Sequence, residues 1–491
     1  MSDVIIIGAG IGGLTAGNLL AKKGHKVIIF ESHTTPGGYT AGFWRKGFYF
    51  ESGTVSLEST HQVFGAMKDI GVLDKISFVP QRSRFVSRIL DTGADDSYEN
   101  FKQVFLKAYG PERERLQAYF KEVDKMHKTM KIFMGITRPS LLSLLTAGIK
   151  MFGVYFKYRN VTLGDFTARY FPRESELYRI FKSFGYPDMA AYILGGAVAT
   201  IFGGYWTVRD GMQSWADVLA ENFRGLGMEL LLNSPAEKII TSNGTAKGII
   251  CNGRPFYADF VISASDYKKT FLKLMDDKSS LPEDFLRKME KAEVSEGFCV
   301  AYLGLNISND ELRASMKFPH VMYMDELPGS ELRDPGDGLF FEKSSVMLYS
   351  PSLHNPKLSP EGRSCLMLMA AVPTHWMNDW GNRDRQKYTG LKEHVKQVLI
   401  KKAGNVVPGL EKHIEFSDFA TPLTFERYTG NTDGATSAWS WNPKNKFYSN
   451  YMKSDVDTPV KNLFIGSCWA TQIGGIPGAL NAAYQCVKRI G

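Results

Sequence analysis

The sequence predicts an α/β fold: a Rossmann-like dinucleotide-binding domain assembled from discontinuous segments, with an α+β substrate domain inserted between them. Three observations predict it. The 491 residues suffice for about three domain-sized units. A short apolar strand near the N-terminus runs into a glycine-rich turn. Two later segments, residues 204–266 and 462–489, carry further apolar strands and helices of the kind that complete such a domain.

The N-terminal segment carries the clearest motif. The wholly apolar run Val4–Ile7 predicts a central parallel strand buried on both faces. A helix is expected over residues 14–23 and a second strand over residues 26–30. Between and after these elements stand the residues of a G-x-G-x-x-G motif and its acid: Gly8, Gly10, Gly12, Gly13 and Glu31. This order of strand, turn, helix, strand and acid predicts a dinucleotide site.

Each residue of the motif has a physical role. Gly8 allows the tight turn, Gly10 lets the backbone approach a pyrophosphate, and Gly13 lets the helix pack closely on the strand. The helix N-terminus supplies free N–H groups and the positive end of its dipole to the phosphates. Glu31 can accept both ribose hydroxyls, and its carboxylate disfavours a 2′-phosphate.

A second glycine pair indicates which dinucleotide binds. Pro36, Gly37 and Gly38 follow the acid closely, and Tyr39 and Thr40 come next. A glycine pair at this place is typical of two-dinucleotide-binding-domain flavoproteins, where it helps to enclose the cofactor. The sequence therefore predicts FAD rather than NAD.

The later segments complete the predicted domain. Strands are expected over residues 229–232, 238–241, 247–251 and 260–265, with a turn at Asn243 and Gly244. A last strand leads into Gly466, and residues 479–489 form a terminal helix. We therefore assign residues 1–84, 201–275 and 431–491 to the FAD-binding domain. Residues 85–200, mainly helical, and 276–430, which mix strands with proline-rich loops, form the substrate domain.

Composition excludes several classes of protein. Hydrophobic residues make up 44% and charged residues 22%, which excludes a mostly disordered chain. The net charge of +8 is modest for this length and has no basic motif, so we expect no nucleic-acid partner. Five scattered cysteines without C-x-x-C indicate reduced thiols, and nine histidines without paired spacing indicate no metal site. No basic targeting region precedes Val4, so a cytoplasmic protein is expected.

Several motifs together resemble a known family. They stand in the family's order over nearly the whole chain: residues 209–212 (RDGM), 232–239 (LNSPAEKI), 349–352 (YSPS), 358–362 (LSPEG), 421–422 (TP), 425–427 (FER) and 475–478 (GIPG). With the N-terminal motif, they make the chain resemble bacterial-type phytoene desaturases, carotenoid cis-trans isomerases and all-trans-retinol 13,14-reductases. The resemblance implies an FAD-dependent oxidoreductase that adds or removes hydrogen across carbon–carbon bonds, or isomerises them, in an apolar isoprenoid or polyene lipid.

The resemblance also implies cofactor contacts and partners. The implied contacts beyond the N-terminal motif are Gly38, Tyr39, Thr40, Ala236, Gly466, Ser467, Gly475, Ile476 and Pro477. An external electron carrier or a quinone is the implied redox partner, and the chain shows no second G-x-G-x-x-G for a nicotinamide. Catalytic residues remain unassigned. The chain differs from the family pattern at Tyr39, where many members have Arg, and at residues 466–469 (GSCW), where Gly-Asp-Ser is usual.

Two apolar stretches bear on the substrate. Residues 140–156 contain one charge, Lys150, and have basic flanks, which predicts peripheral attachment to anionic lipid; a buried helix is the alternative. The uncharged stretch Met189–Val208 could span a bilayer by length. It contains four glycines and runs directly into a segment of the FAD domain, so we expect it to form a core or tunnel wall.

Two other functions stay open. A flavin amine oxidase shares the cofactor domain and would present an aromatic cage and an amine-sized pocket. A non-enzymatic prenyl-lipid-binding module of the Rab GDP-dissociation inhibitor type shares the fold and would show no flavin colour. Cys468, beside the predicted flavin, is either redox-active or a small buried apolar residue.

Overall fold

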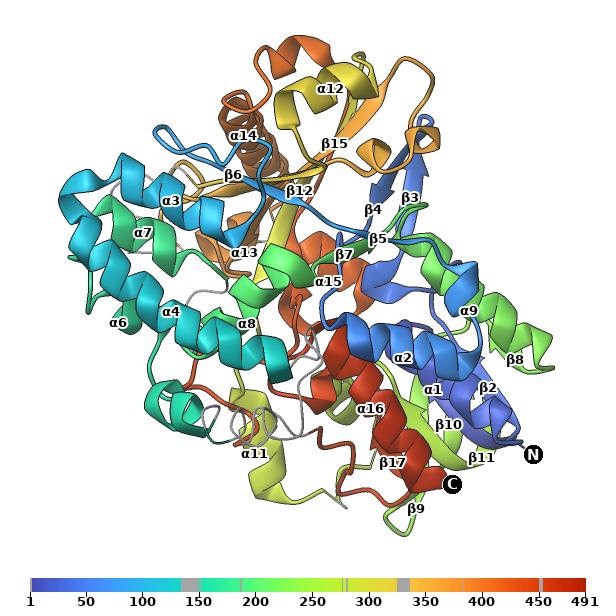
Figure 1. The fold of residues 1–491 in the computed structure, drawn as a ribbon. Coiled ribbons are helices and arrows are strands. Elements are labelled where there is room, and N and C mark those ends of the chain that lie inside the picture. The colour runs from blue at the N-terminus through green and yellow to red at the C-terminus, as the bar shows by residue number, and fades with distance from the viewer. Residues whose placement is uncertain are drawn as a thin grey trace.

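Two sheets and a helical layer organise the molecule (Figure 1). The computed structural model describes residues 2–133, 149, 152–185, 188–275, 277–279, 281–324, 336–382, 384–449 and 454–491. The two termini lie close together at the edge of the first sheet, and the last helix, α16, packs against the first, α1. The predicted α/β fold is confirmed.

The first sheet has a parallel core. Its neighbouring strands, in order, are β8 (Glu229–Leu231), β2 (Val27–Phe30), β1 (Ser2–Ile7), β11 (Arg254–Ser263) and β17 (Leu463–Ile465). Val4, Ile5 and Ile6 are fully buried, as a strand covered on both faces requires. Because the strands come from three distant segments of the chain, this sheet assembles the discontinuous domain that the sequence predicts.

An antiparallel extension continues this sheet. The first half of β11 pairs with β10 (Thr245–Cys251), which pairs with β9 (Ala236–Ser242). Asn243 and Gly244 connect β9 to β10, both with positive φ, 48° and 69°. Two positive φ values define the hairpin turn that Asn-Gly favours. The predicted turn is therefore present.

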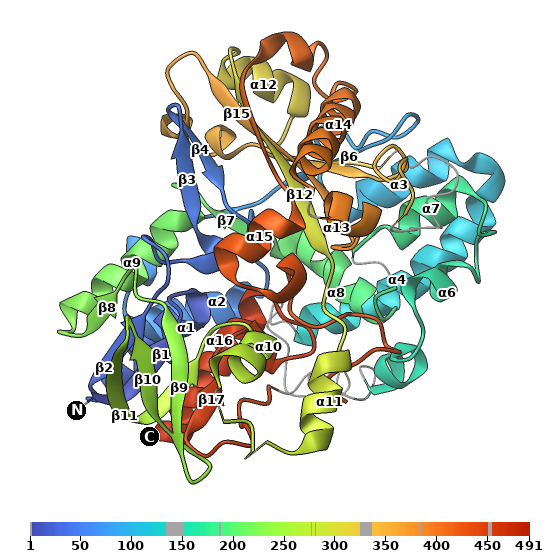
Figure 2. The same ribbon diagram turned by 180° about the vertical axis from the view of Figure 1, so that it is seen from behind.

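Four helices pack against this sheet (Figures 1 and 2). They are α1 (Ile11–Lys22), α2 (Thr60–Ile70), α9 (Met212–Gly225) and α16 (Gly475–Ile490). Helices α1 and α16 begin three and four residues before the predicted positions, 14 and 479. Gly12 and Pro477 are compatible with a first turn, where N–H groups have no partner within the helix.

The second sheet belongs to the inserted regions. Its strands, in order, are β16 (Ile414–Ala420), β12 (Gly297–Leu305), β15 (Ser364–Val372), β14 (Val346–Tyr349), β13 (His320–Tyr323) and β6 (Ser83–Val86). Helices α12 (Asn309–Met316) and α14 (Arg385–Ala403) pack on it. Strand β6 runs parallel to β13. The predicted domain boundary between residues 84 and 85 therefore falls inside a strand of this sheet.

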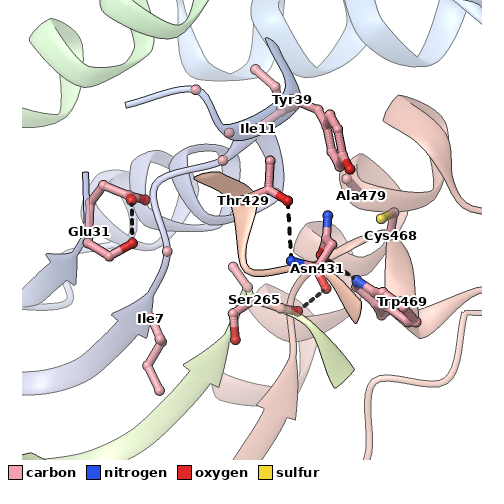
Figure 3. Close-up of a pocket in the computed structure, with 18 of the residues that line it drawn as sticks. Ile7, Ile11, Glu31, Tyr39, Ser265, Thr429, Asn431, Cys468, Trp469 and Ala479 are labelled. Carbon is pink, nitrogen blue, oxygen red and sulfur yellow. Dashed lines mark hydrogen bonds between the residues drawn. The ribbon is translucent and has the colours of Figure 1, made fainter. Parts of the chain in front are cut away.

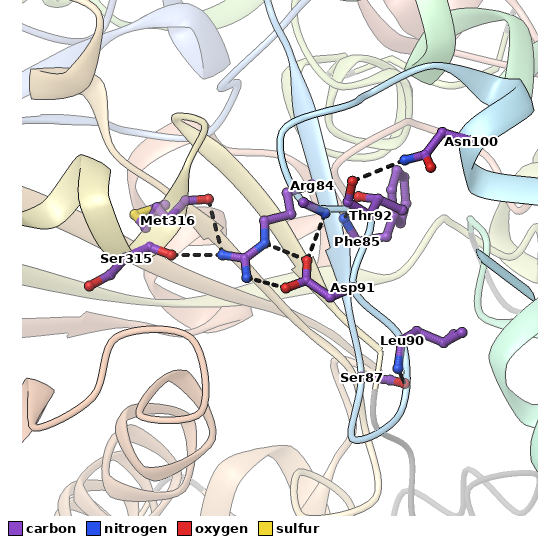
Figure 4. Close-up of polar contacts among 10 residues, drawn as sticks. Arg84, Phe85, Ser87, Leu90, Asp91, Thr92, Asn100, Ser315 and Met316 are labelled. Carbon is purple, nitrogen blue, oxygen red and sulfur yellow. Dashed lines mark hydrogen bonds and ion pairs between the residues drawn. The ribbon is translucent and has the colours of Figure 1, made fainter. Parts of the chain in front are cut away.

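Arg84 holds β6 in place (Figure 4). Its guanidinium donates two hydrogen bonds to Asp91, at 2.8 and 2.6 Å, and one to the Ser315 carbonyl, at 2.7 Å. The ion pair holds the pKa of Asp91 below its ordinary value, chiefly through the Arg84 hydrogen bonds. Because Ser315 lies in the last turn of α12, Arg84 joins the strand, the following loop and the helix in one contact set.

A helical layer follows β6, as predicted for residues 85–200. Its helices are α3 (Tyr98–Ala108), α4 (Arg113–Phe133), α6 (Leu163–Thr167), α7 (Glu176–Lys182) and α8 (Ile193–Ala199). Buried aromatic side chains, including Phe101, Phe105 and Phe181, fill its core. An added Cβ at Gly195 would lie 2.6 Å from the Met126 backbone, so glycine lets α8 pack against α4. Among the described residues, no helix is both long and apolar enough to cross a membrane.

Smaller elements connect the layers. They are β3 (Gly42–Arg45), β4 (Phe48–Glu51), β5 (Phe78–Pro80), β7 (Trp206–Val208), α10 (Tyr267–Lys269), α11 (Glu283–Lys291), α13 (Met377–Asn382) and α15 (Pro422–Thr429). Glu51 at the end of β4 is fully buried and accepts hydrogen bonds from the Met212 N–H and the Tyr49 hydroxyl. Burial raises the pKa of Glu51 to about 8. These contacts fix the hairpin β3–β4 to the start of α9.

Candidate active site

An elongated cavity lies where the parallel strands of the first sheet end (Figure 3). Ile7 ends β1, Glu31 follows β2 and Ser265 follows β11, and all three line it. In Figure 3, Glu31 lies at one end, and Cys468 and Trp469 lie at the other. The carboxyl ends of parallel strands are the usual ligand site of such sheets.

Most of the predicted cofactor residues line this cavity. These are Gly8, Gly10, Gly12, Glu31, Gly38, Tyr39, Thr40, Ala236, Ser467, Gly475 and Ile476. Three others do not. Gly13 packs against the Gly8 carbonyl, Gly466 packs against Ile262, and Pro477 lines an adjoining cavity.

The glycines of the N-terminal turn have two different roles, close packing and open space for a ligand. A Cβ at Gly12 would lie 2.3 Å from the Gly466 carbonyl oxygen, and one at Gly13 would lie 2.1 Å from that of Gly8. A Cβ at Gly10 would meet no protein atom within 4 Å. Gly10 also has an ordinary φ of −71°. The protein itself therefore does not require glycine at position 10, and the open space fits a phosphate group against the N-terminus of α1.

Glu31 is held by backbone groups. Its carboxylate accepts hydrogen bonds from the Ala9 N–H at 2.7 Å and from the His33 N–H at 2.9 Å. Only 8% of the residue is exposed, yet it lines the cavity. The Ser32 hydroxyl donates a third hydrogen bond to this carboxylate, at 3.1 Å. A carboxylate has about four acceptor positions, so about one remains for a ribose hydroxyl.

The second glycine pair lies against the first. Gly37 donates its N–H to the Ala9 carbonyl, and Thr40 donates its hydroxyl to the Gly37 carbonyl. The phenol of Tyr39 lies 3.2 and 3.1 Å from the carbonyls of Gly434 and Ala435. At the position where many family members have Arg, this side chain thus hydrogen-bonds to the loop after α15.

The Ser467–Trp469 segment shows what replaces the usual Gly-Asp-Ser. Ser467 donates its hydroxyl to the Ser265 carbonyl at 2.9 Å, which joins the ends of two parallel strands. The Trp469 indole donates to the Asn431 side chain at 3.1 Å. Asn431 lines the cavity.

Sequence reasoning missed a group of cavity residues at the ends of α10 and α15 and on the loop after α15. They are Lys269, Tyr428, Thr429, Asn431 and Thr436. The nearest sequence signal is the family-like stretch at residues 421–427, directly before them. Nothing in that stretch indicates that the following loop returns to the first sheet.

A second cavity of about 510 Å³ adjoins the first, within the usual size range of ligand pockets. The two share Thr54, Thr436, Gly475 and Ile476. Met189, Tyr192, Ile193, Ile201 and Tyr205 form much of its wall. The prediction that residues 189–208 form a core or tunnel wall is therefore confirmed by their place in the fold.

Glu58 is the one charged side chain among the described residues that line the second cavity. Burial raises the pKa of its carboxyl group to about 7. Sequence reasoning missed this residue because it follows no motif or periodic pattern. A half-buried carboxyl group with a pKa near neutrality can donate or accept a proton at physiological pH.

Cys468 is not a prepared nucleophile. Burial raises the pKa of its thiol to about 12, whereas a reactive cysteine needs a thiolate near neutral pH. The structure therefore favours a small apolar residue, partly buried at the cavity wall, over a redox-active one. Within the described ranges, no three potential ligands from His, Cys, Asp and Glu gather as a metal site would need.

The segment expected at the membrane is described only in part. Within residues 140–156, residues 140–148, 150 and 151 lie outside the described residues. Ile149, Phe152 and Phe156 are 75%, 66% and 48% exposed. The alternative of a buried helix therefore does not fit these three side chains.

Comparison with known proteins relates this geometry to carotenoid and retinoid enzymes. The chain is 26% identical to a chloroplastic prolycopene isomerase of Daucus carota, over 88% of this chain and 71% of that one. It is 26% identical to a 4,4'-diapophytoene desaturase of Methylomonas sp, over 90% and 88%. It is 22% identical to an all-trans-retinol 13,14-reductase of Danio rerio, over 99% and 85%.

A solved structure shares the fold. An oxidoreductase from Methanosarcina mazei superimposes with a TM-score of 0.67 at 15% identity, over 99% of this chain and the whole of that one. The model of the family described as flavin containing amine oxidoreductase matches residues 11–491. The glycine-rich turn, Glu31 and the open space at Gly10 all line the first cavity, and the chain belongs to the flavin-containing amine oxidoreductase family, so its cofactor is FAD.

Proposed function

We propose that this FAD-dependent oxidoreductase adds or removes hydrogen across a carbon–carbon double bond, or isomerises it, in an apolar isoprenoid or polyene lipid. The observation that carries the proposal is the second cavity, which opens from the cofactor cavity at Gly475 and Ile476. Its wall is mainly apolar and aromatic, and it has a single charged side chain among the described residues. The three relatives named above act, by their names, on carotenoids or retinol.

The first cavity supports a specific placement of FAD. In this proposal, the N-terminus of α1 and Gly10 hold the pyrophosphate, and Glu31 accepts a hydrogen bond from a ribose hydroxyl. The segment Gly38–Thr40 encloses the cofactor. Ser467 and the start of α16 lie at the flavin end, where the helix dipole stabilises negative charge. FAD supplies the hydride chemistry, and the chain supplies alignment, exclusion of water and proton transfer.

We propose that electrons come from an external carrier or go to a quinone. The support is that residues 3–31 hold the one strand, G-x-G-x-x-G turn, helix and acid in the sequence. A dedicated nicotinamide-binding domain would need a second strand, glycine-rich turn, helix and acid in this order. We place the protein at a membrane surface, from which an apolar lipid can enter the second cavity.

Anaerobic conversion of three lipids tests this function. The FAD-loaded protein is incubated with prolycopene, 4,4'-diapophytoene or all-trans-retinol, with the flavin oxidised or reduced by dithionite. We expect at least one lipid to change in its polyene absorption and chromatographic retention, and NADPH to reduce the flavin far more slowly than dithionite. Turnover of a primary amine such as benzylamine, with all three lipids unchanged, contradicts the proposal. So does purified protein without flavin absorbance.

A further inference from the structure

We propose that Glu58 is the proton-transfer residue of this site, exchanging one proton with the lipid while a hydride passes between the lipid and FAD. This inference rests on the proposed function and names a residue for it. It follows from three properties of Glu58: where the backbone holds it, what its carboxyl contacts, and how few charges surround it.

The backbone on both sides of Glu58 is fixed. Leu57 and Trp206 exchange two hydrogen bonds, at 2.7 and 3.0 Å, so the chain before Glu58 is tied to β7. Ser59 directly after it has a φ of 55°, a conformation that non-glycine residues rarely adopt. Backbone strain of this kind gathers at functional sites, where the surrounding structure holds it. Glu58 therefore occupies a defined position at the cavity wall.

The carboxyl lies at the junction of the two cavities. A Cβ built on Gly475 would lie 3.1 Å from Glu58 Oε1. Gly475 starts α16 and lines both cavities, with a φ of 73° that suits glycine. The carboxyl oxygen thus stands where the cofactor cavity opens into the apolar cavity. A lipid that occupies the second cavity next to Gly475 would lie close to this oxygen.

No other charged side chain lines the second cavity in the described part of the chain. The other titratable groups that line the cavity in the described part of the chain are the phenols of Tyr192 and Tyr205. Burial raises the pKa of Tyr205 to about 12, so that phenol keeps its proton. The shift in Glu58 itself comes from burial rather than from a neighbouring charge. Glu58 is therefore the one carboxyl group of the described cavity wall.

The proton and electron balance is complete with FAD as the redox partner. For saturation, one alkene carbon takes a hydride from reduced FAD and the other takes the proton of the Glu58 carboxyl group. The alkene is reduced, FAD is oxidised, and the carboxylate regains its proton from water. Desaturation reverses each step, so Glu58 accepts the proton. Isomerisation needs one proton added and one removed, with no net redox change.

Titration of the flavin absorption band tests the placement without turnover. FAD-loaded wild type, Glu58→Gln, Glu58→Asp and the exposed control Glu283→Gln are scanned across about two pH units on either side of pH 7. A charge that appears beside the flavin shifts its band. We expect a spectral change with a midpoint near pH 7 in the wild type, Glu58→Asp and Glu283→Gln. In Glu58→Gln the change should be absent.

Turnover of the lipid identified above supplies the second measurement. Glu58→Gln should lose about a hundredfold or more in rate and lose its pH dependence near pH 7, because general acid–base catalysis contributes factors of that size. A rate that falls above pH 7 indicates a proton donor, and a rate that rises indicates an acceptor. Glu58→Asp should keep the pH dependence at a reduced rate.

Two results overturn the role of Glu58: a flavin band of the wild type that does not change across this range, or a Glu58→Gln protein with the wild-type rate and pH profile. If Glu58→Gln binds no FAD, the wild-type and Glu58→Asp titrations decide. If the wild type converts no lipid while its band titrates near pH 7, the proposed function fails and the placement of Glu58 stands.

Discussion

At the residue scale, we propose that glycine is required at position 10 by the bound cofactor and not by the packing of the protein. Its φ is ordinary and an added Cβ meets nothing within 4 Å, whereas Gly13 has no room for one. Gly10→Val should therefore fold with nearly unchanged stability. Its affinity for FAD should fall at least about tenfold, which corresponds to a loss of about 1.4 kcal/mol of binding free energy. Flavin content and apoprotein melting temperature measure the two effects.

Valine substitutions at Gly65 and Gly13 are the controls that distinguish loss of cofactor binding from loss of packing. Gly65, within α2 and away from the cavities, likewise has nothing within 4 Å of an added Cβ, so Gly65→Val should keep full FAD content. Gly13→Val should destabilise the fold by about 3 kcal/mol, because its Cβ would stand 2.1 Å from a backbone oxygen. Full flavin content in Gly10→Val would show that the pyrophosphate lies elsewhere.

At the scale of the element, β6 depends on Arg84. The Arg84 side chain is 11% exposed, and its guanidinium donates hydrogen bonds to Asp91 and to the last turn of α12. Arg84→Ala should lower the free energy of unfolding by about 2 kcal/mol, since it removes three charge-assisted hydrogen bonds and the packing of a largely buried side chain. Urea unfolding measures it. The exposed Arg82, paired with Asp96, is the control: Arg82→Ala should cost about 0.5 kcal/mol. Equal losses in both variants would contradict the role given to Arg84.

At the scale of the molecule, three of the nine large apolar side chains that are exposed among the described residues lie on one segment: Ile149, Phe152 and Phe156. Phe152 and Phe156 lie one helical turn apart with ring centroids 4.4 Å from each other, and Arg159 lies over the Phe156 ring. Buried in lipid, each ring would contribute about 2 kcal/mol. Phe152→Glu with Phe156→Glu should therefore weaken binding to anionic liposomes at least about tenfold and leave the flavin spectrum intact. Sedimentation with the liposomes measures it. Leu339→Glu, at an exposed apolar residue elsewhere, should bind like the wild type.

Sequence patterns determined the dinucleotide half of this protein. A strand buried on both faces, a turn that needs glycine and an acid at fixed spacing are each written in consecutive residues, so the first sheet, the turn and Glu31 were predicted in place. Helix starts were predicted less well. The first turns of α1 and α16 contain Gly12 and Pro477, which interior propensity disfavours and an N-terminus tolerates.

Only the tertiary structure decided the other half. Strand β6 joins a sheet whose remaining strands lie more than 200 residues later in the sequence. Its four residues, Ser83–Val86, contain no pattern that predicts pairing with β13. Tyr39 likewise donates hydrogen bonds to the carbonyls of Gly434 and Ala435, which lie 395 and 396 residues later in the sequence. Glu58 has no motif of its own; burial and the approach of Gly475 give its carboxyl the pKa and position that the chemistry needs. Local patterns encode strands and turns, whereas pairing and desolvation depend on segments that meet only when the chain has folded.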